Sequence, residues 1–216
     1  PLDAVLTLRG VAQAGRPEQD NPLFDQLSAS WMDRIPGLLS TGWLDLPAPG
    51  DNSLLLRHAR LQKGEAAALP GARLAADGRL QLDAPLTQAA TRAVEQPGQA
   101  IVLPLAALAG GAGATQLLVL QAAPAPSSGG AAALVFVRVD GQALLDPALP
   151  DDDDPNLRVC LTAPATATAT GTQAARRLAG PPGCETDVAA RSLRAVPQAL
   201  TLGGQRLDLL VTEPVT

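Results

Sequence analysis

The chain has 216 residues, of which 46% are hydrophobic and 17% charged, a globular composition that is too apolar for a disordered segment. Its net charge is −5, with a single lysine and scattered arginines, so nucleic acid and anionic membrane surfaces are poor partners for it. No run approaches the roughly 18 to 20 apolar residues that a membrane span needs, and the length allows one large domain or two small ones.

The first helical pattern covers residues 2–14, where apolar side chains form one stripe. The chain opens with Pro1 instead of a methionine, directly at the start of this pattern, so we expect it to be excised from a longer protein, whose missing part could be a membrane anchor. A stripe this short needs a partner to cover it. We therefore expect a parallel homodimer through the N-terminal helix, weak in isolation, with Leu2, Val5 and Leu6 near the symmetry axis.

The next segment predicts a helix followed by a strand. From Phe24 to Met32, apolar residues recur at spacings of three and four, which gives a helix one apolar face. The Pro-Gly pair at 36–37 ends that helix, and residues 38–46 are an apolar run of strand length that carries Trp43. Both tryptophans of an aromatic-poor chain lie in this segment, so we expect it to anchor the main core.

Short helices and strands follow up to residue 123. Residues 54–62 predict a short amphipathic helix, residues 66–82 predict extended pieces joined by turns, and residues 86–95 predict a second helix. Residues 100–105 and 117–122 are apolar runs on either side of a glycine-rich turn, which predicts a hairpin.

A Pro-, Ser- and Gly-rich break at 124–130 is the clearest internal linker. Beyond it we expect a strand at 131–139, a short helix at 142–149, a strand at 157–162 and a hairpin of 198–202 with 205–211. Hairpins with short helices between them indicate an α+β fold with antiparallel sheets. The same order of elements occurs before and after the linker. This predicts a helical stalk at 1–37 and two sheet-bearing subdomains, at 38–123 and 124–216.

Patterns that carry catalysis or bind metals are missing, so we expect neither an enzyme nor a bound cofactor. The four adjacent aspartates at 151–154 lack the alternate spacing and the glycine of a calcium loop, and they predict a solvated loop. His58 has no cysteine nearby, and we expect it to be exposed on the polar face of the 54–62 helix. Neither a nucleophile elbow nor a phosphate-binding glycine loop occurs.

The chain has two cysteines, Cys160 and Cys184, and their spacing is not that of metal ligands. In an oxidising compartment they could form a disulfide, which would add about 3 kcal/mol to the free energy of unfolding. The alternative is two unrelated thiols, and the sequence leaves both open.

The apolar hairpin, together with Trp43 and residues 81–83, is the best candidate for a small-molecule pocket. A sheet lined with aliphatic side chains and edged by a polar group is typical of such pockets, and equally of an ordinary core. The expected walls are Trp43, Leu82, Val102, Leu103, Leu118 and Leu120, and the expected hydrogen-bonding group is Asp83. A carboxylate at the edge of an aliphatic pocket suits a small neutral or cationic ligand.

The order of these pieces resembles a CHASE domain over nearly the whole chain. The matching motifs are the F-x-x-L helix, the Pro-Gly stop, the Gly-Trp strand, an Ala-rich helix before an apolar strand, and a later apolar strand before a Leu-Leu helix. These are carried by Phe24, Leu27, Pro36, Gly37, Gly42, Trp43, residues 89–93, residues 98–105, residues 134–137 and residues 143–145. The family's Pro-Val-Tyr and Tyr-x-Pro segments are absent, because the chain has no tyrosine.

The resemblance implies an extracytoplasmic, periplasmic sensor domain of an inner-membrane receptor, in which two tandem PAS-like subdomains follow a long N-terminal helix. The expected output is a histidine kinase, or otherwise a diguanylate cyclase, that responds to an unknown small-molecule ligand. Asp83 is the nearest positional counterpart of a buried aspartate that binds the ligand in plant members of the family. The alternative is a non-enzymatic envelope adaptor or a cytosolic PAS-like regulator without a ligand.

Overall fold

The structure is a computed structural model, and it describes a set of segments from residue 22 to residue 213. These are residues 22–46, 54–65, 67–105, 116–124, 131–145, 158–163, 166–168, 171–173, 175–181, 183–185, 194–202 and 205–213. The N-terminal helix expected at 2–14, with the dimer contact through it, lies outside the described residues, and so does the aspartate run at 151–154.

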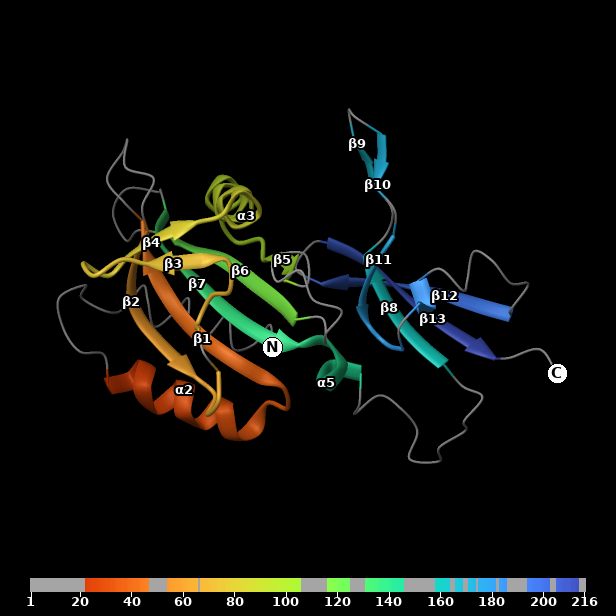
Figure 1. Ribbon diagram of the computed structural model, residues 1–216, viewed down its shortest axis with the longest axis horizontal. Coiled ribbons are helices and arrows are strands. Elements are labelled where there is room, and N and C mark those ends of the chain that lie inside the picture. The colour runs from red at the N-terminus through yellow and green to blue at the C-terminus, as the bar shows by residue number, and fades with distance from the viewer. Residues whose placement is uncertain are drawn as a thin grey trace.

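Antiparallel sheet dominates the described residues (Figure 1). The large sheet has the strand order β3-β4-β2-β1-β7-β6-β5, and neighbouring strands all pair antiparallel. Its strands are β1 (Leu38–Asp45), β2 (Leu54–Leu61), β3 (Ala72–Leu74), β4 (Arg79–Leu82), β5 (Ile101–Pro104), β6 (Gln116–Pro124) and β7 (Ala131–Asp140). The helices are α2 (Pro22–Arg34), α3 (Ala84–Glu95) and the short α5 (Gly141–Leu145).

A smaller sheet has the order β11-β8-β13-β12 and lies beside the β5–β7 end of the large sheet (Figure 1). Its strands are β8 (Arg158–Ala163), β11 (Arg176–Ala179), β12 (Arg194–Leu202) and β13 (Gln205–Glu213), and a two-stranded ribbon of β9 (Thr166–Thr168) and β10 (Gly171–Gln173) extends from it. The hairpin predicted near the C-terminus is confirmed as β12 and β13.

The predicted helix–stop–strand segment is confirmed as α2 followed by β1. Gly37 has a φ of 72°, which suits glycine after a helix, and Asp140 N donates to its carbonyl at 2.8 Å. β1 is buried along nearly its whole length because β2 and β7 flank it in the sheet and the sheet is covered on both sides. The segment is therefore an anchor of the core, as its tryptophans predicted.

The helix predicted at 54–62 is wrong, because these residues form strand β2. β2 pairs with β1 from Leu55 to Leu61 and with β4 through Leu54 and Leu55. In so short an apolar run the sequence period does not distinguish helix from strand, and pairing on both sides decides the outcome. His58 consequently lies in a strand, half-buried, instead of on an exposed helix face.

The first face of the large sheet, which we call the α2 face, packs against α2 and the small sheet. Along β7 the side chains alternate, and Val135, Val137 and Val139 point to this face. They join one buried cluster with Phe24 of α2. The other buried members of the cluster are Leu38, Trp43, Ala100, Val102, Leu117, Val119, Leu145, Leu161, Leu178, Ala179 and Leu207.

The opposite face, which we call the α3 face, packs against α3. Leu134 and Phe136, the alternate residues of β7, belong to a second buried cluster there. Helix α3 begins where the Asp83 carboxylate accepts a hydrogen bond from Leu86 N at 3.0 Å. The residues that α3 buries recur at helical spacing; they are Leu86, Ala89, Ala90 and Ala93.

The large sheet continues past the subdomain boundary expected between residues 123 and 124. β7 follows that point in the chain, yet it lies between β1 and β6 and pairs with both. The small sheet begins only with β8. A linker composition at 124–130 therefore marks a connection within the large sheet.

Candidate functional site

A buried charge interrupts the α3 face near the end of β7. The strand reads ALVFVRVD from Ala133 to Asp140, and alternation places Arg138 on the same face as Leu134 and Phe136. Only 2% of the Arg138 side chain is exposed. A buried guanidinium is costly unless hydrogen bonds and an opposite charge compensate its lost hydration, so its partners define a site.

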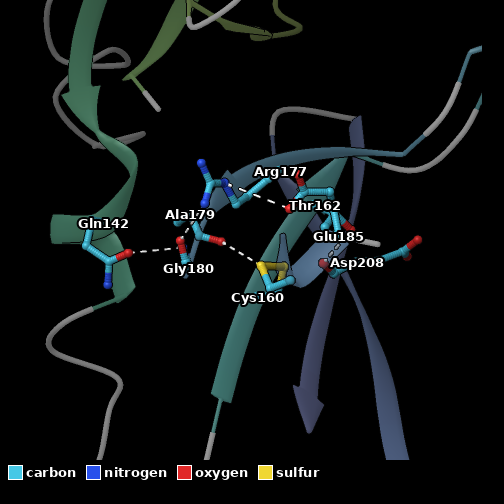
Figure 2. Close-up of a disulfide and its surroundings, with 9 residues drawn as sticks. Gln142, Cys160, Thr162, Arg177, Ala179, Gly180, Glu185 and Asp208 are labelled. Carbon is cyan, nitrogen blue, oxygen red and sulfur yellow. Dashed lines mark hydrogen bonds and ion pairs between the residues drawn. A yellow bond between two sulfur atoms is a disulfide. The ribbon is translucent and has the colours of Figure 1, made fainter. Parts of the chain in front are cut away.

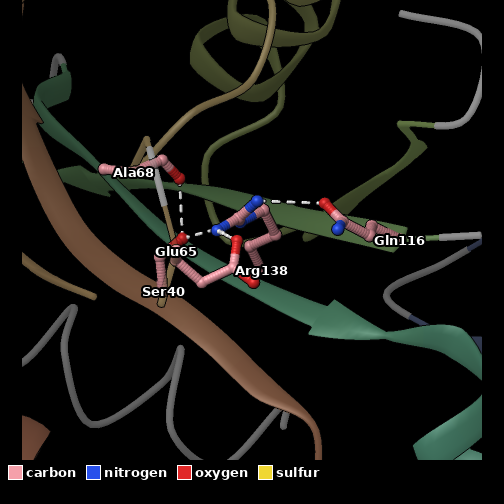
Figure 3. Close-up of polar contacts among 5 residues, drawn as sticks. All are labelled: Ser40, Glu65, Ala68, Gln116 and Arg138. Carbon is pink, nitrogen blue, oxygen red and sulfur yellow. Dashed lines mark hydrogen bonds and ion pairs between the residues drawn. The ribbon is translucent and has the colours of Figure 1, made fainter. Parts of the chain in front are cut away.

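Three side chains from separate parts of the chain accept hydrogen bonds from Arg138 (Figure 3). Its Nε donates to Ser40 Oγ at 3.0 Å, and its Nη1 donates to Gln116 Oε1 at 3.0 Å. Its Nη2 donates to Glu65 Oε2 at 2.5 Å. Ser40 Oγ in turn donates to the Ala68 carbonyl at 2.6 Å. We call these five residues the Arg138 cluster.

The acid of this cluster comes from a turn and not from the sheet. After β2 the chain turns through Gly64, whose φ is 100°, and Glu65 N donates to Gln62 O at 3.1 Å. The Glu65 side chain is 26% exposed, so one end of the ion pair is near water while Arg138 is buried. Ser40 and Gln116, by contrast, lie on β1 and β6.

An apolar cavity of about 260 Å³ adjoins the cluster on the β2–β3–β4 side of this face. Its walls are aliphatic and come from β2, the segment before β3, β3 and β4; they are Leu56, Ala59, Leu61, Ala67, Ala68, Leu69, Ala72, Leu74 and Leu80. Ala68 belongs to both the cavity wall and the Arg138 cluster. Leu61 and Leu74 are 37% and 60% exposed, so the cavity has apolar residues at the surface, as ligand grooves do.

The seven residues predicted to contact a ligand are divided between the two faces. Trp43 and Val102 belong to the cluster on the α2 face. The remaining wall residues lie on the α3 face, where Leu118 and Leu120 belong to the buried cluster and Leu82 and Leu103 pack against that cluster. Asp83 caps helix α3. The structure thus brings the four leucines together and separates them from Trp43 and Val102, and none of the seven lines the described cavity.

Sequence reasoning missed the Arg138 cluster, although one signal was visible. Arg138 is the single charged residue within the apolar run from Leu134 to Val139, and a charge in a fully buried strand needs a partner. Its partner Glu65 is 73 residues away, and no sequence pattern connects them.

On the α2 face, His58 is part of an aromatic cluster. Its ring centroid lies 4.6 Å from Trp43 and 5.2 Å from Phe24, and the Trp43 and Phe24 centroids are 5.9 Å apart. Edge-to-face and tilted contacts of this kind stabilise a core. Among the residues that the structure describes, no group of three or more His, Cys, Asp or Glu side chains could hold a metal ion.

Cys160 and Cys184 form a disulfide, the outcome that the sequence had left open (Figure 2). Both cysteines are buried, and the bridge joins β8 to the turn after β11. Gly180, in the same turn, donates its N–H to Gln142 Oε1 of α5 at 3.0 Å. The bridged part of the small sheet is therefore attached to the short helix that follows β7.

No helix among the described residues has the length and apolar character to cross a bilayer. No protein-family model matches the chain, and no curated protein matches it by sequence. Solved structures do match its fold over nearly the whole length.

The periplasmic sensory domain of the Campylobacter jejuni chemoreceptor Tlp1 matches with a TM-score of 0.54 at 9% identity, over 99% of this chain and 85% of that chain. The ligand-binding domain of the Pseudomonas aeruginosa PAO1 amino acid chemoreceptor PctC, in complex with GABA, matches with a TM-score of 0.53 at 13% identity, over 99% and 89%. The chain shares the fold of these sensory domains. The likeness supports the sensor-domain fold in general and does not single out the CHASE family.

Proposed function

We propose that this chain is an extracytoplasmic, ligand-sensing domain of a membrane-bound receptor. The observation that carries the proposal is the fold match to two chemoreceptor sensory domains, which covers 99% of the chain. A disulfide between two buried cysteines fits an oxidising compartment such as the periplasm. The chain itself would not be an enzyme, and the response would come from another part of the receptor.

We place the ligand in the cavity of the α3 face. A volume of about 260 Å³ is at the small end of ligand pockets, and it suits a molecule of a few heavy atoms. The PctC domain is a ligand-binding domain that holds GABA, which is a compound of this size class. The four leucines Leu82, Leu103, Leu118 and Leu120 would support this face from within the core, and a direct ligand contact by any of the seven predicted residues stays a prediction.

The finer assignments rest on the CHASE resemblance of the sequence. They are a histidine kinase or a diguanylate cyclase as output, an inner-membrane anchor outside the chain, and a homodimer through the helix at 2–14. We also propose two tandem PAS-like subdomains, with the boundary moved to the connection between α5 and β8. The large sheet would then be the membrane-distal subdomain, and the small sheet the membrane-proximal one.

A thermal-shift screen of small metabolites against the chain tests the proposal. A ligand at about 100 times its Kd stabilises the protein by about 2.7 kcal/mol. The variant Ala59→Leu adds volume inside the cavity and should abolish the shift, because Ala59 lines it. Ala76→Leu, at an exposed turn position, is the matched control and should leave the shift intact. A broad screen without a hit would contradict the sensor function and favour a ligand-free adaptor. A ligand whose thermal shift is unchanged in the Ala59→Leu variant would show that the binding site lies outside this cavity.

A further inference from the structure

We propose that the ligand of this site is a small monocarboxylate with a short aliphatic chain, and that its carboxylate replaces Glu65 on Arg138. The proposal rests on the sensor function above and names the chemistry of its ligand. It also reverses the ligand charge expected from the sequence, which favoured a neutral or cationic compound beside Asp83. The reason is that Asp83 is engaged as a helix cap, whereas the charge next to the cavity is a buried guanidinium.

Packing alone does not account for an arginine at position 138. The two residues that precede Arg138 at alternate positions of β7, Leu134 and Phe136, are fully buried hydrophobic side chains. Apolar residues of similar volume in place of both Arg138 and Glu65 would avoid the desolvation of a charge, and such replacements of buried ion pairs are often neutral or stabilising. The guanidinium instead provides planar, paired N–H donors, the geometry that binds a carboxylate.

Glu65 is the exchangeable partner of Arg138. The backbones of Ser40 and Gln116 are fixed in the paired strands β1 and β6, so both residues stay beside Arg138 unless the sheet is disturbed. Glu65 lies in a turn, is 26% exposed, and follows Gly64, around which a Cβ would meet nothing within 4 Å. A ligand carboxylate has the same charge and shape as the Glu65 carboxylate. The exchange therefore preserves the charge balance at Arg138, while the Glu65 side chain moves into water.

The cavity specifies the remainder of the ligand. Ala68 accepts the hydrogen bond of Ser40, which itself accepts from Arg138, and Ala68 also forms part of the cavity wall. A ligand with its carboxylate on Arg138 can thus extend its chain along the aliphatic lining. The described residues that form that lining include no charged side chain, so an ammonium group in the chain of the ligand would lose its hydration without a partner among them.

The test is a series of straight-chain monocarboxylates from acetate to hexanoate, titrated by calorimetry into the wild-type chain and into Glu65→Gln. The substitution keeps the size of the side chain and removes the competing charge. We expect the best carboxylate to bind Glu65→Gln at least about tenfold more tightly than wild type, a gain of about 1.4 kcal/mol. The matched amide, for example butyramide against butyrate, should bind at least about tenfold more weakly. Glu95→Gln, at an exposed position of α3, is the charge-matched control and should change nothing.

Arg138→Gln should abolish carboxylate binding. It also removes a buried side chain that the fold uses, so a loss of binding in this variant does not separate ligand contact from folding. Glu65→Gln is therefore the deciding variant. An affinity that is unchanged or weaker in Glu65→Gln overturns the proposal, as does an amide that binds as well as its acid. The proposal is also overturned if no carboxylate of the series binds the Glu65→Gln variant more tightly than it binds the Glu95→Gln variant. The sensor function would survive these outcomes if another compound bound and Ala59→Leu abolished its binding.

Discussion

The α2 face and the α3 face of the large sheet are formed by the same strands, but they bury different kinds of side chain. On the α2 face, Phe24, Trp43 and His58 stack against one another, and valines of β7 meet the small sheet. On the α3 face, aliphatic side chains of β2, β3, β4 and the segment before β3 line a cavity, and Arg138 is buried next to it. The packed aromatic rings give the α2 face the properties of a structural core, whereas the described cavity and the buried charge make the α3 face our candidate for the binding site. Each prediction below tests that division.

The largest effect is expected on the α2 face. Trp43→Ala removes an aromatic side chain that is 4% exposed, and it should lower the free energy of unfolding by about 3–5 kcal/mol. Chemical denaturation followed by circular dichroism measures this. Trp31→Ala, half-buried at the border of the same cluster, is the control and should cost clearly less. At a temperature where the variant is folded, Trp43→Ala should bind ligand as wild type does. A changed affinity would contradict the division between the faces.

A smaller effect is expected from Glu65→Ala on the α3 face. Removing the acid leaves the Arg138 guanidinium buried without its counter-charge, which should lower the free energy of unfolding by about 1–3 kcal/mol. The loss is no larger because Glu65 is partly exposed to water. Arg138→Met together with Glu65→Leu replaces both members of the ion pair by apolar side chains of similar volume. It should change stability by less than about 1 kcal/mol, or raise it. Equal losses in the two variants would show that the ion pair holds the sheet together and is not kept for binding.

The smallest effect concerns Asp83. Asp83→Ala removes the cap of α3 and should cost about 1 kcal/mol of stability, as the loss of an N-cap does. Ligand affinity, measured by titration calorimetry, should stay within twofold of wild type because the carboxylate is engaged with Leu86 N. Asp83→Ser, which also caps helices, is the matched control and should keep most of the stability. A loss of binding in both variants would restore Asp83 as the ligand contact that the sequence suggested.

Local patterns in the sequence predicted much of the secondary structure. The helix of α2 with its Pro-Gly stop, the capped helix α3 and the β5–β6 hairpin are all where spacing and turn residues placed them. The helix predicted at 54–62 failed because pairing with β1 and β4 is a long-range effect that outweighs a weak local period. The domain boundary expected at 123/124 falls at the end of β6, within the large sheet, and stays a prediction. Strand β7 returns to pair with β1, and no local signal records that.

The site was less predictable than the fold, because a site depends on which face each residue occupies. Val102 and Leu103 are neighbours in one strand and therefore point to opposite faces, so both could not line one pocket. That much was available from the sequence. The pairing of Arg138 with Glu65 was not, since it depends on a turn after β2 that reaches a strand 73 residues later.

Strand β7 connects the two faces through a single stretch of backbone. Arg138 belongs to the site on one side, while its neighbours Val137 and Val139 pack into the cluster that includes Leu161 and Leu207 of the small sheet. The strand then continues directly into α5, where Gln142 holds Gly180 beside the disulfide. Adjacent residues of a strand cannot tilt independently of one another. A displacement of the β7 backbone at Arg138 would accordingly also displace Val137 and Val139, on which the small sheet packs.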